Sequence, residues 1–236
     1  MKSGLDAMRT KDHGSVGVEL ESHDEARWHF DWLCEKWSQD AVEFAERRLE
    51  KMGVHHIQDG CELIGGVIRP IMIPIRQGIT SDWLRKIVGE PEECLEINGN
   101  LLLNAGIQRM EDNLIAVPAS TAVFDNTHSR IGVGDSNTAE AATQTDLQAI
   151  AGATHRQFKL QVASYPQRPG SNGNQSVDWR SDFLTGEANF AWQEWGVDNG
   201  TANATTVSAP MLNRKVQSLG TKTTGTWTMT GTLTIS

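Results

Sequence analysis

The chain has few cysteines, no cluster of basic residues and no long apolar run, and each scarcity excludes a class of protein. Cys34, Cys61 and Cys94 form no CxxC pair, and their odd number argues against both a disulfide framework and a zinc knuckle. Because no run of about 18 apolar residues exists, no membrane-spanning helix is predicted. The N-terminal stretch MKSGLDAMRTKDHGSV has no apolar core, so we expect no secretory signal and a cytoplasm-like compartment.

Positive charge is also in deficit, with 21 Lys and Arg residues against 30 Asp and Glu residues and a formal net charge of −9. Nucleic-acid backbones and anionic lipid headgroups repel a surface of this sign. We therefore expect neither a nucleic-acid partner nor a membrane partner. The chain is long enough to form a substantial hydrophobic core, since it has 236 residues, of which 38% are hydrophobic.

The first part of the chain predicts an arm followed by a helix. Residues 1–22 combine glycine and charge without hydrophobic periodicity, which predicts a mobile arm. Apolar residues then recur at steps of three and four as far as Met52, and Ser22 and Glu25 have the spacing of a capping box. Since Gly53 fits the position that ends a helix, one long amphipathic helix is predicted from Ser22 to Gly53.

Three tryptophans lie on that predicted helix: Trp28, Trp32 and Trp37. Aromatic side chains at helical spacing are most often packed in a core, so we interpret them as core or subunit-interface residues. A sugar-stacking platform or a groove for a partner protein is the alternative interpretation.

A segment interrupted by prolines follows at 67–78, VIRPIMIPIRQG. Its β-branched residues alternate, but Pro70 and Pro74 cannot donate a hydrogen bond to a strand ladder. The pattern predicts an edge strand or an extended arm that lies along another surface. Pro70 and Pro74 therefore join the three tryptophans as candidate interface residues.

Two shorter helices and a turn are predicted next. Thr80 or Ser81 can cap a helix over DWLRKIV, and Asn98-Gly99 is a turn signal between two apolar runs. Asn104 can cap a second helix, whose predicted buried stripe consists of Ile107, Met110, Leu114 and Ile115.

From about residue 120 the sequence is threonine-rich, punctuated by glycine and strongly alternating. TWTMTGTLTIS places Trp227 and other apolar residues on one face and threonines on the other, which predicts a half-buried strand. Five more strands are predicted at HSRIGVGD, FKLQVASY, VDWRSDFL, ANFAWQEWGVD and MLNRKVQSLG. Short strands joined by turn clusters predict an antiparallel β-sandwich of jelly-roll or Greek-key type.

The predicted fold class is therefore α+β. It has a mobile arm at 1–22, a helical and extended N-terminal region at 23–97, and an antiparallel β-sandwich at 98–236 with one leading helix.

The stretch RIGVGDSN resembles a phosphate-binding loop, but its context points to a strand. A phosphate loop needs a third glycine and a helix directly after it, so that backbone amides and the helix dipole face the anion. Gly132 and Gly134 instead alternate with Ile131 and Val133. We predict that the two glycines lie in a strand and leave room for a large side chain such as that of Trp192 or Trp195.

A cluster of carboxylates and tryptophans is the remaining enzymatic candidate. The carboxylates are Asp178, Asp182, Glu187, Glu194 and Asp198, and the tryptophans are Trp179, Trp192 and Trp195. Paired acids with aromatic surfaces are the materials of a glycosidase cleft or a sugar-binding site. Along ANFAWQEWGVD, however, Phe190, Trp192 and Glu194 share a face, which favours a scaffold role with Glu194 as a buried acceptor for a loop. We expect no catalytic residue, no metal and no cofactor.

Four blocks of the chain resemble, in their order, a family of virion proteins from tailed bacteriophages. The blocks are NGNLLLNAGIQRMEDNLIA, SRIGVGDSNTAEAATQTDLQA, GEANFAWQEWGVDNG and LNRKVQSLGTKTTGTWTMTGTLTIS. The GVGDS strand followed by a W-x-E-x-G strand is also similar to the collar domain at the start of phage tail fibres. The resemblance covers roughly residues 98–236.

The resemblance implies a non-enzymatic virion component with a β-rich domain and many copies per particle. Within that class we favour a capsid decoration or cement protein, because the chain shows neither the repeats nor the coiled coil of a fibre shaft. The implied partners are the major capsid protein or other virion subunits, together with further copies of the chain. A tail-fibre, collar or baseplate adaptor protein is the alternative, and a carbohydrate-binding module for host attachment is the second alternative.

Overall fold

The computed structural model describes residues 28–52, 61–64, 67–70, 79–115, 117, 123–169, 175–200 and 210–235. The predicted arm at 1–22, the capping pair Ser22 and Glu25, and Pro74 lie outside these residues.

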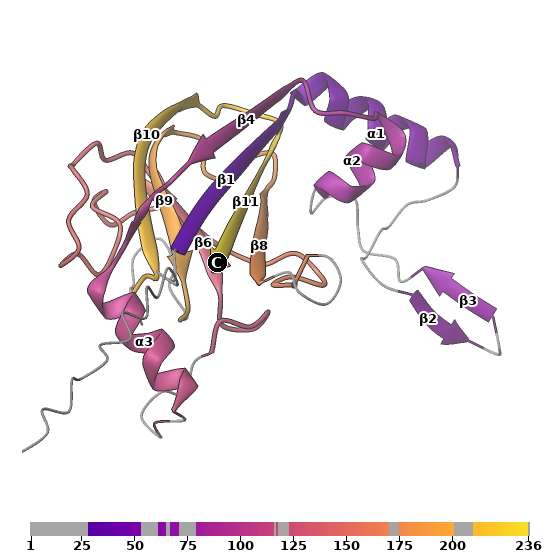
Figure 1. Cartoon of the computed structure of the whole chain (residues 1–236). Helices are drawn as coiled ribbons and strands as arrows, with labels where there is room; N and C mark the ends of the chain where they lie inside the picture. The colour runs from indigo at the N-terminus through magenta and orange to yellow at the C-terminus, as the bar shows by residue number, and fades with distance from the viewer. Residues whose placement is uncertain are drawn as a thin grey trace, which may run out of the picture.

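Strands are the main secondary structure of the described chain, and all but β2 and β3 belong to two antiparallel sheets (Figure 1). The four-stranded sheet has the order β4 (Glu93–Asn98), β1 (Trp28–Trp37), β11 (Thr226–Ile235) and β8 (Ser176–Phe183). The five-stranded sheet has the order β5 (Leu101–Leu102), β10 (Asn213–Thr221), β9 (Ala191–Asp198), β6 (Arg130–Gly134) and β7 (Arg156–Leu160). The six strands predicted after residue 120 are all present and antiparallel. We call the two sheets together the two-sheet body.

The long helix predicted from Ser22 to Gly53 is wrong, because residues Trp28–Trp37 form strand β1 and, among the described residues of this range, only Gln39–Lys51 form a helix, α1. Trp28 and Trp32 are four residues apart, a spacing that fits both a helix face and a strand face. The backbone of β1 pairs with β11 on one side and with β4 on the other, so tertiary pairing decides for the strand. Ser38 directly follows β1 and caps α1, its hydroxyl accepting the Ala41 N–H at 3.3 Å.

Aromatic side chains fill the space between the two sheets. Trp32 of β1 meets Trp195 of β9 edge-on, with ring centroids 6.3 Å apart. Trp192 of β9 contacts both Phe183 of β8 and Trp227 of β11, with ring centroids 4.9 Å apart in each pair. The two sheets therefore pack face to face, and Trp32 lies in this core and not at a subunit interface.

A second, smaller core lies at one end of the four-stranded sheet (Figure 1). Helices α1 and α2 (Ser81–Ile87) pack there with Trp37, whose exposed fraction is 1%. Trp37 points to this cluster because it lies on the opposite face of β1 from Trp32. Of the three candidate interface tryptophans, only Trp28 is exposed, at 46%.

A separate hairpin, β2 (Cys61–Ile64) and β3 (Val67–Pro70), lies apart from the two-sheet body in Figure 1. Its strands pair with each other, Cys61 opposite Pro70 and Ile64 opposite Val67. Residues 67–70 of the segment predicted at 67–78 are thus a strand in a two-stranded sheet, and residues 71–78 lie outside the described residues. Pro70 is the last residue of that strand.

The predicted boundary between residues 97 and 98 does not separate two structural units, because β1 and β4 belong to the same sheet as β8 and β11. Gly99, with φ +68°, forms the predicted turn, but this turn carries the chain from β4 in one sheet to β5 in the other. The helix predicted after it is present as α3 (Asn104–Leu114).

The cap and the buried stripe predicted for α3 are not as expected. The N-cap is Leu103, and no side chain caps the helix. Leu114 and Ile115 are 86% and 70% exposed. The start of α3 lies close against the body, because a Cβ on Gly106 would lie 2.4 Å from the Leu212 Cα atom, and Met110 of the predicted stripe packs against the core.

Candidate functional site

Gly132 and Gly134 lie in strand β6, as the sequence predicts, and make room for large neighbours. A Cβ on Gly132 would lie 2.5 Å from the Phe158 ring, and one on Gly134 would lie 2.6 Å from Glu194 Oε1. The prediction that the glycines accommodate Trp192 or Trp195 is wrong, because both indoles point to the opposite sheet. No helix follows β6 in residues 135–155, so the stretch lacks the geometry of a phosphate loop.

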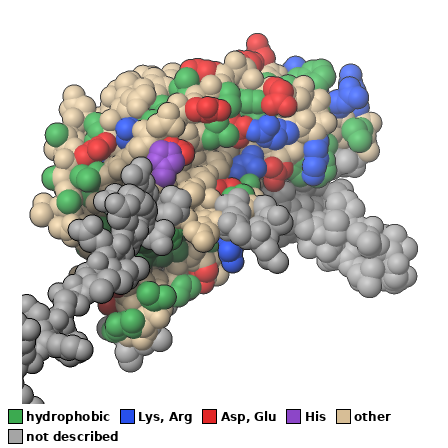
Figure 2. Space-filling view, viewed as in Figure 1, with side chains coloured by type: hydrophobic (Ala, Val, Ile, Leu, Met, Phe, Trp, Pro, Cys, Tyr) green, Lys and Arg blue, Asp and Glu red, His purple; other side chains and the backbone are tan. Residues whose placement is uncertain are grey.

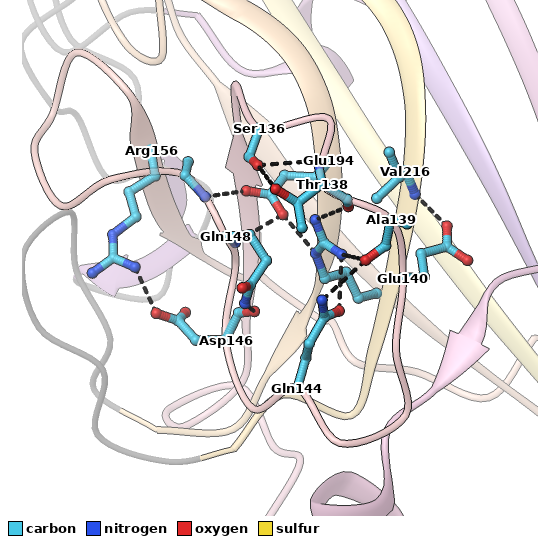
Figure 3. A network of polar contacts seen from close by, with 12 residues as sticks. Ser136, Thr138, Ala139, Glu140, Gln144, Asp146, Gln148, Arg156, Glu194 and Val216 are labelled. Atoms are coloured by element: carbon cyan, nitrogen blue, oxygen red, sulfur yellow. Dashed lines mark hydrogen bonds and ion pairs between the residues drawn. The ribbon is translucent and has the colours of Figure 1, made fainter.

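Glu194 and Arg214 form an ion pair that is completely buried beneath the loop at 136–149, which we call the covering loop (Figure 3). Arg214 Nε donates to Glu194 Oε2 at 2.6 Å, and both side chains are 0% exposed. Glu194 also accepts the backbone N–H groups of Gln148 at 2.9 Å and Ala149 at 2.6 Å. Glu194 is thus a buried hydrogen-bond acceptor for a loop, as the sequence predicts.

Arg214 holds the other half of the covering loop. Its guanidinium donates to the Thr138 carbonyl at 2.8 Å and to Gln144 Oε1 at 2.9 Å. Glu140, on the same loop, accepts the Val216 backbone N–H of β10. Arg156 and Asp146 pair at 2.5 Å near the end of the loop. The role of Arg214 has no simple signal in the sequence, since it lies in an ordinary alternating strand.

Trp192 and Glu194 do not share a face, contrary to the prediction from strand alternation. The pairing of β9 with β10 is irregular at this point, because Glu194 lies opposite Val216 while Trp192 lies opposite Gly220. Residues 217–219 of β10 lie opposite the single residue 193 of β9, so the regular ladder is interrupted between Trp192 and Glu194. Trp192 consequently enters the core, where its indole N–H donates to the Ala188 carbonyl at 2.9 Å, whereas Glu194 faces the covering loop.

The other carboxylates of the predicted cluster are spread over separate places. Asp178 accepts the Thr232 hydroxyl at 2.7 Å, and burial raises the pKa of its carboxyl. Asp182 lies on the same strand, β8, in the sheet opposite Glu194. Glu187 pairs with Lys159. These contacts hold elements of the chain together, and the described residues bring no two of these acids to one cleft beside Trp192 and Trp195.

A buried polar cluster joins α2 to the outer face of the four-stranded sheet. Asp182 accepts the Ser81 backbone N–H at 2.7 Å, the Ser81 hydroxyl at 2.8 Å and the Thr228 hydroxyl at 2.7 Å. Arg180 donates to the Ser81 hydroxyl at 2.6 Å and to Asp82 at 3.0 Å. Thr228 is 0% exposed, so this end of the threonine face of β11 is buried and not solvated.

We expect Asp182→Asn to loosen α2 without unfolding the two-sheet body. The amide keeps one acceptor oxygen but loses the charge that strengthens three hydrogen bonds, which costs about 2 kcal/mol. Hydrogen exchange should show faster exchange in residues 81–87, with little change in β9. Asp40→Asn, an exposed position on α1, is the control. Uniform acceleration across both sheets would contradict this local role.

The surface hollows in the described part of the chain are shallow. One of them has a volume of about 490 Å³ and is lined by Phe124, Asp125, Asn126, Tyr165 and neighbouring residues. Trp28 lines a smaller one of about 240 Å³ with Phe30 and Leu233. Trp192 and Trp195 are both 0% exposed and line neither hollow.

Strand β4 is a free edge of the two-sheet body. Among the described residues it pairs with β1 alone. Its exposed residues include Glu93 and Glu96. On the face shown in Figure 2, Lys and Arg side chains gather over α1 and α2, and hydrophobic side chains lie at the exposed end of α3. The molecule therefore offers surfaces and an edge for contact more clearly than it offers a cleft.

Comparison with known proteins gave no match to a protein-family model, to a curated protein or to a solved structure. Within the described ranges, no group of three or more His, Cys, Asp or Glu residues is arranged to hold a metal ion. None of the helices in those ranges combines the length and the apolar character needed to cross a membrane.

Proposed function

We propose that the protein is a non-enzymatic structural component of a tailed-bacteriophage virion, with the two sheets forming a β-sandwich of jelly-roll or Greek-key type. The observation that carries the proposal is that residues from three of the four blocks that resemble the virion family contact one another in the folded chain. Gly134 of the GVGDS block has no side chain, which leaves room for Glu194 of the W-x-E-x-G block. Arg214 of the LNRKVQ block then pairs with Glu194, and both hold the loop that follows GVGDS.

Gly196, the glycine of the W-x-E-x-G block, has a matching role. A Cβ at this position would lie 2.1 Å from the Asn213 carbonyl oxygen, so β9 and β10 can approach only if residue 196 is glycine. The pattern that suggested the virion family is therefore a set of packing requirements within one sheet. This supports a scaffold interpretation of the blocks, because the same residues are occupied in packing and in internal hydrogen bonds.

Within the virion class we favour a capsid decoration or cement protein that stabilises the shell through contacts repeated by symmetry. The free edge of β4 and the hairpin β2–β3 support this choice, since unpaired strands add readily to strands of neighbouring subunits. The implied neighbours are the major capsid protein, other virion subunits or further copies of the chain. A tail-fibre, collar or baseplate adaptor protein is the alternative.

The residues proposed for carbohydrate binding are not accessible to a sugar. A sugar ring stacks on an accessible aromatic face, and the indoles of Trp192 and Trp195 have no exposed surface. Glu194, the proposed acid of a glycosidase, is likewise 0% exposed and neutralised by Arg214.

Antibodies against the full chain, used to label purified virions of the encoding phage, test the proposal. Label distributed over the head in many copies is the expected result. Label at one end of the tail would favour the adaptor alternative over decoration, and virions without any label would overturn the structural-component proposal.

Complementation with variants tests the contribution of β4. We expect Glu96→Lys to reduce incorporation into particles at least tenfold, because the acidic edge would lose its complementarity to a basic partner strand. Glu50→Lys, an exposed charge reversal on α1, is the matched control and should incorporate normally. Equal incorporation of both variants would exclude the β4 edge as the contact.

A further inference from the structure

Lys222 is a buried lysine whose amine lies inside a turn of the chain. The side chain is 0% exposed and lies directly after β10, which ends at Thr221. Its Nζ donates to the Leu184 carbonyl at 2.9 Å and to the side-chain carbonyl oxygen of Asn189, Oδ1, at 3.0 Å. Fully buried lysines are rare, because removing an ammonium ion from water costs several kcal/mol.

The backbone fixes the turn around this amine. Lys222 N–H donates to the Phe190 carbonyl at 3.0 Å, and Ala188 holds a positive φ of 49°. The Trp192 indole N–H donates to the Ala188 carbonyl at 2.9 Å, so the turn is anchored in the aromatic core. This turn places the Asn189 carboxamide within 3.0 Å of Lys222 Nζ, the proximity that a reaction between the two groups requires.

Burial also makes the amine more reactive. Desolvation lowers the pKa of Lys222 to about 8, against the opposing effect of the negative charge of Glu187. At pH 8 about half of the amine is then neutral and nucleophilic, whereas an exposed lysine is almost entirely protonated. The electrophile is the Asn189 carbon Cγ, which is bonded directly to the oxygen that Nζ contacts.

We propose that Lys222 and Asn189 react to form an isopeptide bond within the chain. The Nζ lone pair attacks Asn189 Cγ, a new C–N bond forms, and the bond from Cγ to Nδ2 breaks. Nδ2 takes one proton from Nζ and leaves as ammonia, while the other Nζ proton remains as the amide N–H. No group is oxidised or reduced, and no further reactant is needed.

Two neighbouring features assist this reaction. Glu187 lies in the same turn, where its carboxylate accepts the Leu184 N–H at 2.8 Å and pairs with Lys159, and its negative charge acts on the Lys222 amine. We assign Glu187 to carry the proton from Nζ to the leaving nitrogen. Asn189 is exposed, so the ammonia has a route to solvent. The product would link the connection between β8 and β9 to the connection between β10 and β11, which suits a protein under mechanical load but does not depend on the proposed function.

Intact mass spectrometry of the purified full chain, incubated at pH 8, tests the proposal. The expected mass is lower than the sequence mass by about 17 Da, one ammonia. Asn189→Ala and Lys222→Arg should each restore the full mass, and Glu187→Gln should leave most molecules unlinked. Lys215→Arg is the matched control, because the Lys215 amine also contacts an asparagine, at the Asn98 backbone carbonyl, and its loss should leave the mass deficit unchanged.

Peptide mapping locates the deficit. A branched peptide that contains both Lys222 and Asn189 is the expected product. A deficit confined to Asn98-Gly99 or Asn199-Gly200 would instead indicate succinimide formation and would overturn the proposal, as would an unchanged mass in the wild-type chain. Asn189→Ala alters an exposed side chain, so this variant keeps the test valid if Lys222→Arg does not fold.

Discussion

Gly225→Ala is expected to destabilise the protein by about 3–5 kcal/mol, the combined cost of backbone strain and of a collision with a neighbouring strand. Gly225 has φ +73°, which an alanine adopts only with strain. A Cβ there would also lie 2.2 Å from the Trp37 carbonyl oxygen and 3.1 Å from the Ser38 carbonyl carbon. Those atoms belong to the junction between β1 and α1, where Trp37 pairs with Thr226 and Ser38 caps the helix.

Urea denaturation of the wild type and of two variants measures this effect. Gly186→Ala is the matched control, because Gly186 also has a positive φ, +89°, but a Cβ there would meet nothing within 4 Å. The control should lose only about 1–2 kcal/mol, the cost of the strained backbone alone. If both variants lose the same free energy of unfolding, the close approach of Gly225 to the backbone of Trp37 and Ser38 does not contribute to the cost.

Glu194→Gln is expected to lower the free energy of unfolding by about 3–5 kcal/mol, since it leaves the buried Arg214 guanidinium without its countercharge. The covering loop should loosen as well, because Glu194 accepts two of its backbone N–H groups. Hydrogen exchange at Gln148 and Ala149 would report this loosening. The removal of both charges in Glu194→Gln/Arg214→Met should cost less than the sum of the single changes.

Glu43→Gln is the control for the charge change, because Glu43 and Arg47 form an exposed pair on α1 at 3.4 Å. Exposed pairs of this spacing contribute about 0.3–0.5 kcal/mol. A loss below about 1 kcal/mol for Glu194→Gln would be incompatible with the structural role that we assign to the buried pair.

Much of the second half of the chain could be predicted from its sequence because alternation is a direct consequence of strand geometry. TWTMTGTLTIS places Trp227 and Met229 in the core, both less than 10% exposed, as alternation requires. The role of Glu194 as a buried acceptor for a loop was also predicted, although the shared face with Trp192 on which that prediction rested is not present. The positions of its partners were not predicted, since Arg214 and the covering loop are brought to it only by the pairing of β9 with β10 and β6.

The first half shows where local pattern is insufficient. Trp28, Trp32 and Trp37 fit a helix, and an isolated segment offers no information against it. The segment is a strand because β11 and β4, which lie far away in the sequence, supply hydrogen-bonding partners on both sides. Helix propensity differs between ordinary residues by about 0.7 kcal/mol at most. Each cross-strand side-chain pair contributes about 0.2–1 kcal/mol, and β1 forms such pairs with strands on both sides.

The sequence by itself therefore determined the antiparallel strands after residue 120, the helix at 104–114 and the strand character of the GVGDS stretch, because each follows from side-chain periodicity or turn chemistry within a short window. Only the tertiary structure decided that Trp28–Trp37 is a central strand, that β1 and β4 complete the sheet of β8 and β11, and that Lys222 meets Asn189. These outcomes depend on contacts between residues far apart in the chain, and no short stretch of sequence contains both partners of such a contact.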